Sequence, residues 1–309
     1  MPKLVIDTDT GSDDAIALLM ALAHPDAEVL ALTTVAGNVP LDQATRNAKS
    51  TLRVANRPEI PVFVGCDRPL VHPLETATEV HGDDGLGNVH LPDPGIDSQG
   101  EHAVPALVRL AAESNGDHDL ITLGPLTNVA AALAIDPDLL TRFRRTVIMG
   151  GAPDVVGNVT DMAEFNIWVD PEAAARVFAA PGVRTMVGWN VSMTAGLVSP
   201  EQRKAMAEVG TASGQFAHDV TSVVEAFCHQ ELGIPFFSLP DPLAVAIALD
   251  DAIATRTQSI GVTVGRSDEA RGATFPAHLN ADAPPTDIVW EADGDAFQAQ
   301  MFEALRALP

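Results

Sequence analysis

The sequence contains few basic residues and only two cysteines, and both shortages exclude classes of protein. Its 309 residues include 18 lysines and arginines against 42 aspartates and glutamates, which gives a formal net charge of −24. A phosphate backbone would be repelled at long range, so we expect no nucleic-acid partner. The two cysteines, Cys66 and Cys228, lie far apart and form neither a disulfide framework nor a zinc-binding spacing.

Long apolar runs are also absent. The longest unbroken run covers residues 15–23, whereas a membrane-spanning helix needs about 20 apolar residues. The first residues lack the basic, apolar and small-residue regions of a signal peptide. We therefore expect a cytoplasmic protein with no membrane partner. Hydrophobic residues still make up 46% of the chain, which is enough for a large core and excludes global disorder.

Short apolar runs alternate with helical patterns through the first two-thirds of the chain. Apolar strands between helices are typical of an α/β fold, in which helices flank both faces of a largely parallel sheet. The expected strands cover residues 4–6, 29–35, 60–64, 120–123, 146–149 and 185–187. The expected helices cover residues 16–23, 41–55, 104–112, 126–133, 171–179 and 217–230. Near the C-terminus we expect short strands at 259–264, 272–275 and 288–290, then a helix at 296–308.

Two segments interrupt this alternation. Residues 66–101 are rich in proline, glycine, histidine and aspartate, and residues 231–240 follow the last helix of the middle region. Loops of the first length are usually lids or binding loops. We see no linker, repeat or tail. We therefore expect a single domain over residues 1–309 with loop insertions at about 66–101 and 231–240.

Four carboxylates follow the first expected strand: Asp7, Asp9, Asp13 and Asp14. In an open α/β sheet, ligands bind beyond the carboxyl ends of the strands, where this cluster falls. Such a cluster repels itself unless a cation binds, and no lysine or arginine occurs between it and Arg46. A hard cation with oxygen ligands is the natural answer. Zinc is disfavoured because no cysteine or histidine spacing accompanies the cluster.

Other motifs explain the acidic cluster less well. Capping of the next helix by Ser12 and Asp13 explains two residues but not the four carboxylates. An EF-hand loop starting at Asp7 would place Leu18 where a glutamate ligand is needed. The start of the cluster is also similar to the motif of haloacid dehalogenase phosphatases. That family needs a lysine after a strand, and neither Lys49 nor Lys204 is in such a position.

A third family matches far more of the chain. Residues 7–14 (DTDTGSDD) resemble the DxDxGxDD signature of the nucleoside hydrolases, the inosine–uridine-preferring N-ribohydrolase family. Seven further blocks resemble that family in order: 33–38 (TTVAGN), 81–87 (HGDDGLG), 123–128 (LGPLTN), 149–151 (MGG), 157–160 (GNVT), 163–167 (AEFNI) and 241–244 (DPLA). The resemblance implies an open Rossmann-like fold and hydrolysis of a small-molecule nucleoside to ribose and free base. It also implies a homodimer or homotetramer.

The resemblance implies one bound calcium ion, Ca²⁺, at the bottom of the pocket. Its expected ligands are the side chains of Asp9, Asp14 and Asp241 and the main-chain carbonyl of Leu123. Asp9 is also expected to take a proton from water whose pKa the metal lowers. Asp9, Asn38 and Asp241 together form the expected catalytic set.

Further residues are implied around the substrate. Amide and carboxylate side chains suit ribose hydroxyls, because each hydroxyl both donates and accepts a hydrogen bond. Asp7 is expected behind the metal ligands, where it would orient Asp9 or the metal. The expected ribose contacts are Asp13, Asn38, Asn158, Glu164 and Asn166, with Met149 as the floor of the ribose site and His81 reaching the base.

The leaving-group site departs from the family pattern. Many members have a histidine acid just before the late aspartate, but this chain has Pro240, which has no proton to give. A second branch stacks aromatic rings on a purine, and Phe236 and Phe237 are the first candidates for that role. His229 or His81 acting as an acid is the other route. We expect purine nucleosides to be favoured. The alternatives are a hydrolase of another N-riboside, modified or nicotinamide-type, and a nucleoside- or ribose-binding protein with weak turnover.

Overall fold

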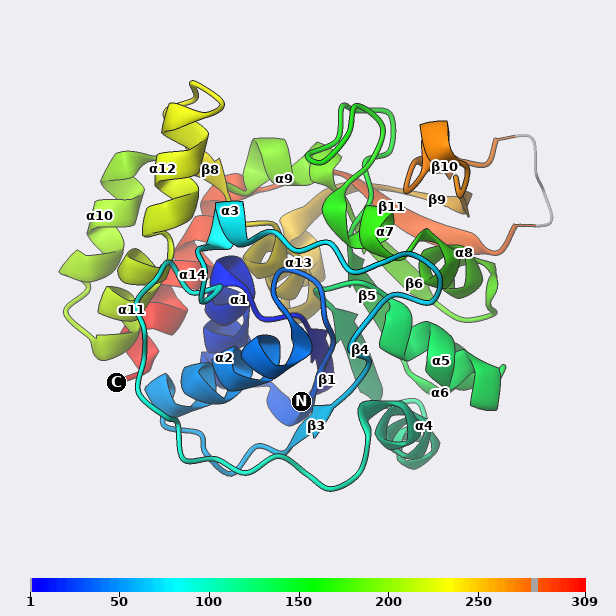
Figure 1. Ribbon diagram of the computed structural model, residues 1–309, viewed down its shortest axis with the longest axis horizontal. Helices are drawn as coiled ribbons and strands as arrows, with labels where there is room; N and C mark the ends of the chain where they lie inside the picture. The colour runs from blue at the N-terminus through cyan, green and yellow to red at the C-terminus, as the bar shows by residue number, and fades with distance from the viewer. Residues whose placement is uncertain (1, 279–282) are drawn as a thin grey trace.

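The computed structural model describes residues 2–278 and 283–309. In this part of the chain, nine strands form one sheet in the order β10-β9-β11-β6-β5-β4-β1-β2-β3 (Figure 1). The seven strands from β11 to β3 in this order run parallel, while β9 and β10 pair antiparallel at one edge. The strands are β1 (Lys3–Thr8), β2 (Glu28–Thr34), β3 (Val62–Val64), β4 (His118–Thr122), β5 (Arg145–Met149), β6 (Arg184–Val187), β9 (Ala254–Val264), β10 (Thr274–Pro276) and β11 (Pro285–Ala292). The predicted α/β class, with extra strands near the C-terminus, is confirmed.

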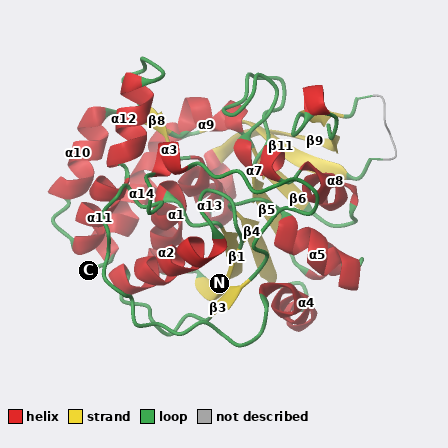
Figure 2. Cartoon of the chain, viewed as in Figure 1, coloured by secondary structure: helices red, strands yellow, loops and turns green. Residues whose placement is uncertain are grey.

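Helices cover both faces of this sheet (Figure 2). One face carries α1 (Ser12–Ala23), α2 (Leu41–Val54), α9 (Trp189–Ala195), α11 (Ala212–Val220), α13 (Pro240–Leu249) and α14 (Gly294–Ala307). The other carries α4 (Ala103–Ser114), α5 (Thr127–Ile135), α6 (Leu139–Arg142) and α8 (Pro171–Ala179). Because alternate side chains of a strand point to opposite faces, Leu4 and Ile6 of β1 join the first core and Val5 joins the second.

The strand order changes direction beside β1. From β1 the chain moves to β2 and β3 on one side, and it then returns to β4, β5 and β6 on the other side. Ligands of open α/β sheets bind at the carboxyl ends of the strands on either side of such a switch. The helix that follows β1 there is α1, which is buried almost throughout and packs against α13. The acidic residues that start α1 are therefore held by the centre of the fold.

The structure divides one predicted helix. Residues 217–230 belong to two helices, α11 and α12 (Ser222–Gln230), with a break at Thr221. The Thr221 hydroxyl donates to the main-chain oxygens of Ala217 at 2.9 Å and His218 at 3.0 Å. Its oxygen accepts from Nε of Arg203 at 3.1 Å. A hydroxyl that bonds its own backbone competes with the regular helix ladder, which explains the break.

The predicted insertions are only partly loops. Residues 66–101 contain a single helical turn, α3 (Thr78–His81), which packs beside α12 (Figure 1). Residues 231–240 contain β8 (Phe237–Ser238), which pairs with β7 (Leu197–Val198), and α13 already begins at residue 240. Two further helices, α7 (Phe165–Val169) and α10 (Pro200–Glu208), complete the set. Among residues 2–278 and 283–309, no helix has the length and apolar character needed to cross a membrane.

Candidate active site

Three buried carboxylates meet where α1 and α13 begin. One oxygen each of Asp13, Asp14 and Asp241 lie within 4.8 Å of one another. Asp13 and Asp14 belong to the first turn of α1, and Asp241 belongs to the first turn of α13. Because α1 and α13 pack together, residues more than 200 positions apart in the sequence converge on one point. The positive ends of both helix dipoles favour negative charge there.

Asp9 lies beside this group and is held on several sides. Its Oδ2 atom accepts from the main-chain N–H of Asn38 at 2.6 Å, while Oδ1 is buried without a hydrogen-bond partner. Gly37 and Gly124 face the carboxylate directly. A Cβ on Gly37 would lie 2.1 Å from Oδ2, and a Cβ on Gly124 would lie 2.6 Å from Oδ1. Both glycines therefore permit a close approach of backbone to carboxylate that no larger residue allows.

The carboxylates of this cluster all have raised pKa values. Burial is the main cause throughout, and it raises the pKa of Asp13 and of Asp14 to about 6. For Asp9 and Asp241, burial and then the charges of the neighbouring carboxylates hold the pKa well above its ordinary value. The cluster is costly to ionise on its own, and a bound cation would remove that cost.

The donor set fits a hard divalent cation. It consists of carboxylate oxygens, and two of them, Oδ1 of Asp9 and Oδ1 of Asp13, are buried without a hydrogen-bond partner. Calcium prefers oxygen ligands of this type, whereas zinc sites use sulfur or nitrogen. Of the predicted ligands, Asp14 and Asp241 have carboxylate oxygens within 4.8 Å of each other, which is close enough for both to bind one ion. The third member of that close group is Asp13, for which we had expected only a contact with ribose.

Asp7 lies behind this cluster and anchors the ends of three strands. Its Oδ1 atom accepts from the hydroxyl of Thr33 at 2.5 Å and from Nδ2 of Asn128 at 2.8 Å, while Oδ2 is buried without a partner. Its main-chain oxygen accepts from the N–H of Leu123 at 2.8 Å. Burial raises the pKa of Asp7 to about 7. Sequence analysis missed the role of Asn128, although this residue ends the LGPLTN block.

The predicted ribose residues form a second group next to the acids. Glu164 caps α7: its Oε1 accepts from the N–H of Asn166 at 3.0 Å, and its Oε2 accepts from the N–H of Gly151 at 2.8 Å. Nδ2 of Asn166 donates to the main-chain oxygens of Leu123 at 2.7 Å and Met149 at 3.3 Å. Burial raises the pKa of Glu164 to about 7, and the nearby charge of Asp13 adds to this rise. Asn166 therefore links Glu164 to the Leu123 carbonyl that is predicted to bind metal.

Asn158 differs from the other ribose candidates. It is exposed on the loop before α7, and its Oδ1 accepts from the N–H of Phe165 at 2.9 Å. The structure therefore connects the Asn158 side chain to the backbone next to Glu164.

Asn38 and His81 lie on the other side of the acidic turn. Nδ2 of Asn38 donates to Oδ2 of Asp14 at 3.2 Å. Nδ1 of His81 lies 2.8 Å from the hydroxyl of Ser12, accepts from the Ser12 N–H at 3.3 Å, and is 3.7 Å from Oδ1 of Asp13. Burial lowers the pKa of His81 to about 4, so the ring is neutral at pH 7. An Nδ1 atom that accepts from the backbone leaves the proton on Nε2. Ser12 was missed as a contact, although it lies inside the acidic signature.

The aromatic candidates separate into exposed and buried residues. Phe237 is 1% exposed and its ring packs in the apolar core, so of the two expected stacking residues Phe236 has the more accessible ring. The short β7–β8 pair turns this side chain inward, while Phe236 stays partly exposed. His229 is exposed near the end of α12. Trp168, another aromatic of the chain, is covered by the guanidinium of Arg271 at 3.9 Å from its ring centre.

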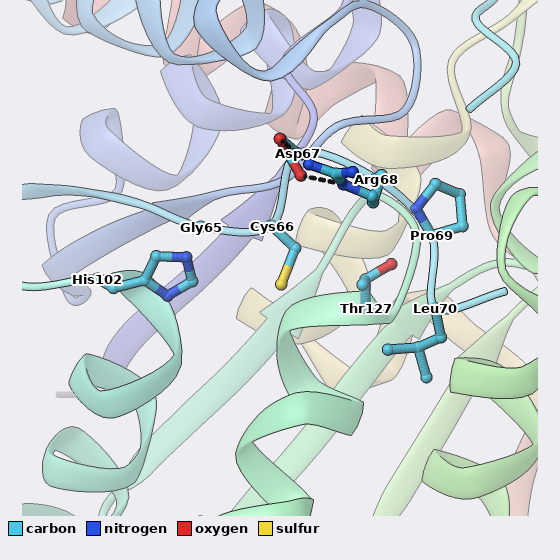
Figure 3. A pocket seen from close by; sticks show the side chains of 8 residues that line it. All are labelled: Gly65, Cys66, Asp67, Arg68, Pro69, Leu70, His102 and Thr127. Atoms are coloured by element: carbon cyan, nitrogen blue, oxygen red, sulfur yellow. Dashed lines mark hydrogen bonds and ion pairs between the residues drawn. The ribbon is translucent and has the colours of Figure 1, made fainter. Parts of the chain in front are cut away.

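An open cavity lies apart from the clustered carboxylates. It has a volume of about 510 Å³ and is lined by residues 65–70 together with His102 and Thr127 (Figure 3). Figure 3 shows the ion pair of Asp67 and Arg68 among the lining residues. None of the clustered carboxylates lines it. The chemistry of the site therefore comes from the buried acids and not from this open depression.

Comparison with known proteins matches the chain and its fold to one family. The model of the inosine-uridine preferring nucleoside hydrolase family matches residues 4–299. The pyrimidine-specific ribonucleoside hydrolase RihA of Klebsiella pneumoniae is 36% identical over 297 residues, which cover 95% of each chain.

Two solved structures are similar over nearly their whole length. A plant nucleoside hydrolase, PpNRh1, superposes with a TM-score of 0.94 at 30% identity and covers 99% of both chains. A purine-preferring ribonucleoside hydrolase from Gardnerella vaginalis superposes with a TM-score of 0.92 at 30% identity and covers 98% of both chains. These relatives differ in the base that their names give, so similarity alone does not assign a base to this chain.

Proposed function

Because the chain belongs to the inosine-uridine preferring nucleoside hydrolase family, we propose that it hydrolyses the N-glycosidic bond of ribonucleosides with calcium bound at the acidic cluster. One observation carries the proposal beyond family membership. Four carboxylates converge in the interior, and Oδ1 of Asp9 is buried there without a partner. A buried acceptor of this kind requires a ligand, because leaving it unpaired costs about 1–3 kcal/mol.

The proposed calcium ligands are the carboxylates of Asp9, Asp14 and Asp241 and the main-chain oxygen of Leu123. Asp13 also has an unpartnered oxygen in the cluster and faces the same space. When bound, calcium supplies positive charge that orients a water molecule and ribose hydroxyls and lowers the pKa of the water. Asn166 donates to the Leu123 carbonyl and so holds it in place.

Asp9 is the proposed general base. The N–H of Asn38 holds its Oδ2 atom, and Gly37 and Gly124 confine the carboxylate on two sides. Only Oδ1 is left to accept a proton. A base that is fixed in this way loses little freedom when the reaction occurs.

Glu164, Asn166, Asn38 and Asp13 are the proposed contacts of the ribose hydroxyls, and Met149 is the proposed floor. Cleavage of a glycosidic bond passes through a sugar with oxocarbenium character. Buried carboxylates next to the sugar stabilise that positive charge more strongly than water would. Asn158 is exposed before binding, so we propose that it joins the ribose contacts when its loop closes over the substrate.

The leaving base has few possible proton donors in this chain. Pro240 has none, and the sequence contains no tyrosine, so a phenol cannot act as the acid. The proposed base site uses the partly exposed ring of Phe236 for stacking and the Nε2–H of neutral His81 as a donor. Purine rings accept a proton more readily than uracil, and stacking adds to their binding. We therefore propose a preference for purine nucleosides.

A turnover panel tests this function. Inosine, adenosine, guanosine, uridine, cytidine and nicotinamide riboside would be assayed with a reducing-sugar readout, with and without added calcium. We expect calcium-dependent release of ribose, faster from purine nucleosides than from uridine. Saturable binding of nucleoside by calorimetry without ribose release would indicate a binding protein instead. Turnover of nicotinamide riboside alone would indicate a different N-riboside as substrate.

A further inference from the structure

Asn47 of α2 connects the acidic turn to the loop that carries His81. Its side chain is buried, and Nδ2 donates both of its hydrogens to main-chain oxygens, to Thr10 at 2.9 Å and to Asp84 at 2.8 Å. Its Oδ1 accepts from Nε2 of Gln43 at 2.8 Å. Thr10 lies between the proposed base Asp9 and the start of α1. One amide therefore joins two segments that are more than 70 residues apart in the sequence.

The loop on the far side of Asn47 has a defined internal structure. Asp84 accepts at its carboxylate from the N–H groups of Leu86, Asn88 and His90, each at 2.8 Å. Gly85 has a φ of +72°, and a Cβ there would lie 2.8 Å from Nδ2 of Asn47. The loop is therefore shaped to lie against Asn47, and its main attachment to α2 at this point is the Asp84 carbonyl.

His81 lies at the start of the same loop. Its main-chain oxygen accepts from the N–H of Gly87 at 2.8 Å, and its ring contacts Ser12 on the acidic turn. Ser12 therefore contacts the ring itself, through its hydroxyl and its N–H.

The backbone beyond the ring is bonded to α2 by three side chains. The Asp84 carbonyl accepts from Asn47 and from Nε2 of Gln43 at 3.1 Å, and the Leu91 carbonyl accepts from the Arg46 guanidinium at 3.0 Å. Asn47 also bonds the acidic turn at Thr10, so it joins that turn directly to the loop.

From this geometry we propose that Asn47 is a positioning residue for departure of the base. Alongside the bonds from Gln43 and Arg46 to the same segment, it joins residues 82–91 to the acidic turn at Thr10 and thereby positions the His81 ring there. It touches neither the proposed metal ligands nor the substrate through its side chain. The consequence for catalysis rests on the proposed function, because it assumes that His81 assists the leaving group. The attachment of the loop does not depend on that assumption.

The test compares two variants with a matched control. Asn47→Leu has a similar volume but cannot donate to Thr10 or Asp84, and Asn47→Ser is a milder change should the first variant fold poorly. Thr51→Val is the control, because it removes a buried hydrogen bond from Thr51 Oγ1 to the main chain on the same helix without touching the loop. The readouts are amide hydrogen exchange of residues 82–91, calcium affinity by calorimetry, and kcat/KM for inosine and for nitrophenyl riboside.

We expect at least tenfold faster exchange of residues 82–91 in the Asn47 variants, and no such change in Thr51→Val. We also expect kcat/KM for inosine to fall at least tenfold more than kcat/KM for nitrophenyl riboside, whose activated leaving group needs no assistance. Equal losses on both substrates, or a tenfold loss of calcium affinity, would place the effect at Thr10 and Asp9 and overturn the proposal. Unchanged exchange would overturn it as well. If the wild-type protein cleaves no nucleoside, the proposed function fails, and the exchange experiment still decides whether Asn47 holds the loop.

Discussion

Without bound metal, the free energy of unfolding should fall as pH rises from about 4 to about 7. Paired carboxylates in folded proteins usually have the opposite effect, because their lowered pKa makes stability rise with pH. An aspartate in an unfolded chain has a pKa of about 3.9. In the folded protein without metal, burial raises the pKa of Asp13 and Asp14 to about 6 and that of Asp7 to about 7. Between pH 4 and pH 7 the folded state therefore binds more protons than the unfolded state. The free energy of unfolding must then fall as pH rises through this window.

The size of the effect follows from the shifts. A rise of about two units for Asp13 corresponds to about 3 kcal/mol, and a rise of about three units for Asp7 to about 4 kcal/mol. This stability is fully present below pH 4 and is lost by about pH 7. Either loss is a large fraction of the roughly 5–15 kcal/mol that stabilises a typical domain. Calcium binds the deprotonated carboxylates, so its stabilising effect grows over the same window.

Urea unfolding in 0.5 M KCl, at steps from pH 4.5 to 7.5, measures how the free energy of unfolding depends on pH. One curve is measured for the chelated protein and one for the calcium-loaded protein. The salt screens the repulsion among surface acids, which would otherwise add to the slope. The double variant Asp13→Asn with Asp14→Asn should flatten the chelated curve, whereas Asp26→Asn, a change at an exposed acid, should leave it unaltered. A chelated protein that keeps or gains stability between pH 5 and pH 7 would refute the reasoning.

Three further predictions concern activity. Asp9→Asn, which keeps the shape but loses the basic oxygen, should lower kcat by at least about 10²-fold, and a variant that keeps a tenth of wild-type kcat would show that the base is elsewhere. Gly124→Ala places a Cβ 2.6 Å from Oδ1 of Asp9 and should lower kcat by about 10²-fold because the carboxylate must move; normal kcat would argue against confinement of this carboxylate. Phe236→Ala should lower kcat/KM for inosine more than kcat/KM for nitrophenyl riboside, and equal losses would rule out stacking.

Periodicity predicted the sheet because each parallel strand is a short apolar run between amphipathic helices. The same criterion failed for α13, because Pro240–Leu249 is buried on nearly all sides and has no polar face to create a period. It also joined α11 to α12, since the break at Thr221 depends on hydrogen bonds to the main chain and to Arg203. The periodicity of apolar residues therefore did not predict these helices, because their bounds depend on tertiary contacts.

The acidic part of the site was predictable because its residues are close in sequence. Asp7, Asp9, Asp13 and Asp14 lie within eight positions at a strand end, so local geometry already brings them together. The supporting contacts were not predictable in this way. Asn47 and Asn128 reach the cluster from distant helices. Nothing in the immediate sequence of Asn47 distinguishes it from an ordinary buried amide, and the LGPLTN block that contains Asn128 does not show which of its side chains bonds Asp7.

The proposed ribose contacts and the proposed base contacts lie on different kinds of structure, and this explains why the base is harder to assign than the ribose. The proposed metal and ribose contacts lie at helix starts and strand ends that the central sheet fixes. The proposed base contacts lie on loops: His81 is held by Ser12 and, through Asp84, by Asn47, while Phe236 differs from buried Phe237 only through a two-residue strand pair. A shift of one residue in that strand pairing would bury the ring of Phe236 and expose the ring of Phe237. Relatives with the same fold can therefore differ in base preference, and for this chain the preference depends on how rigidly those loops are held.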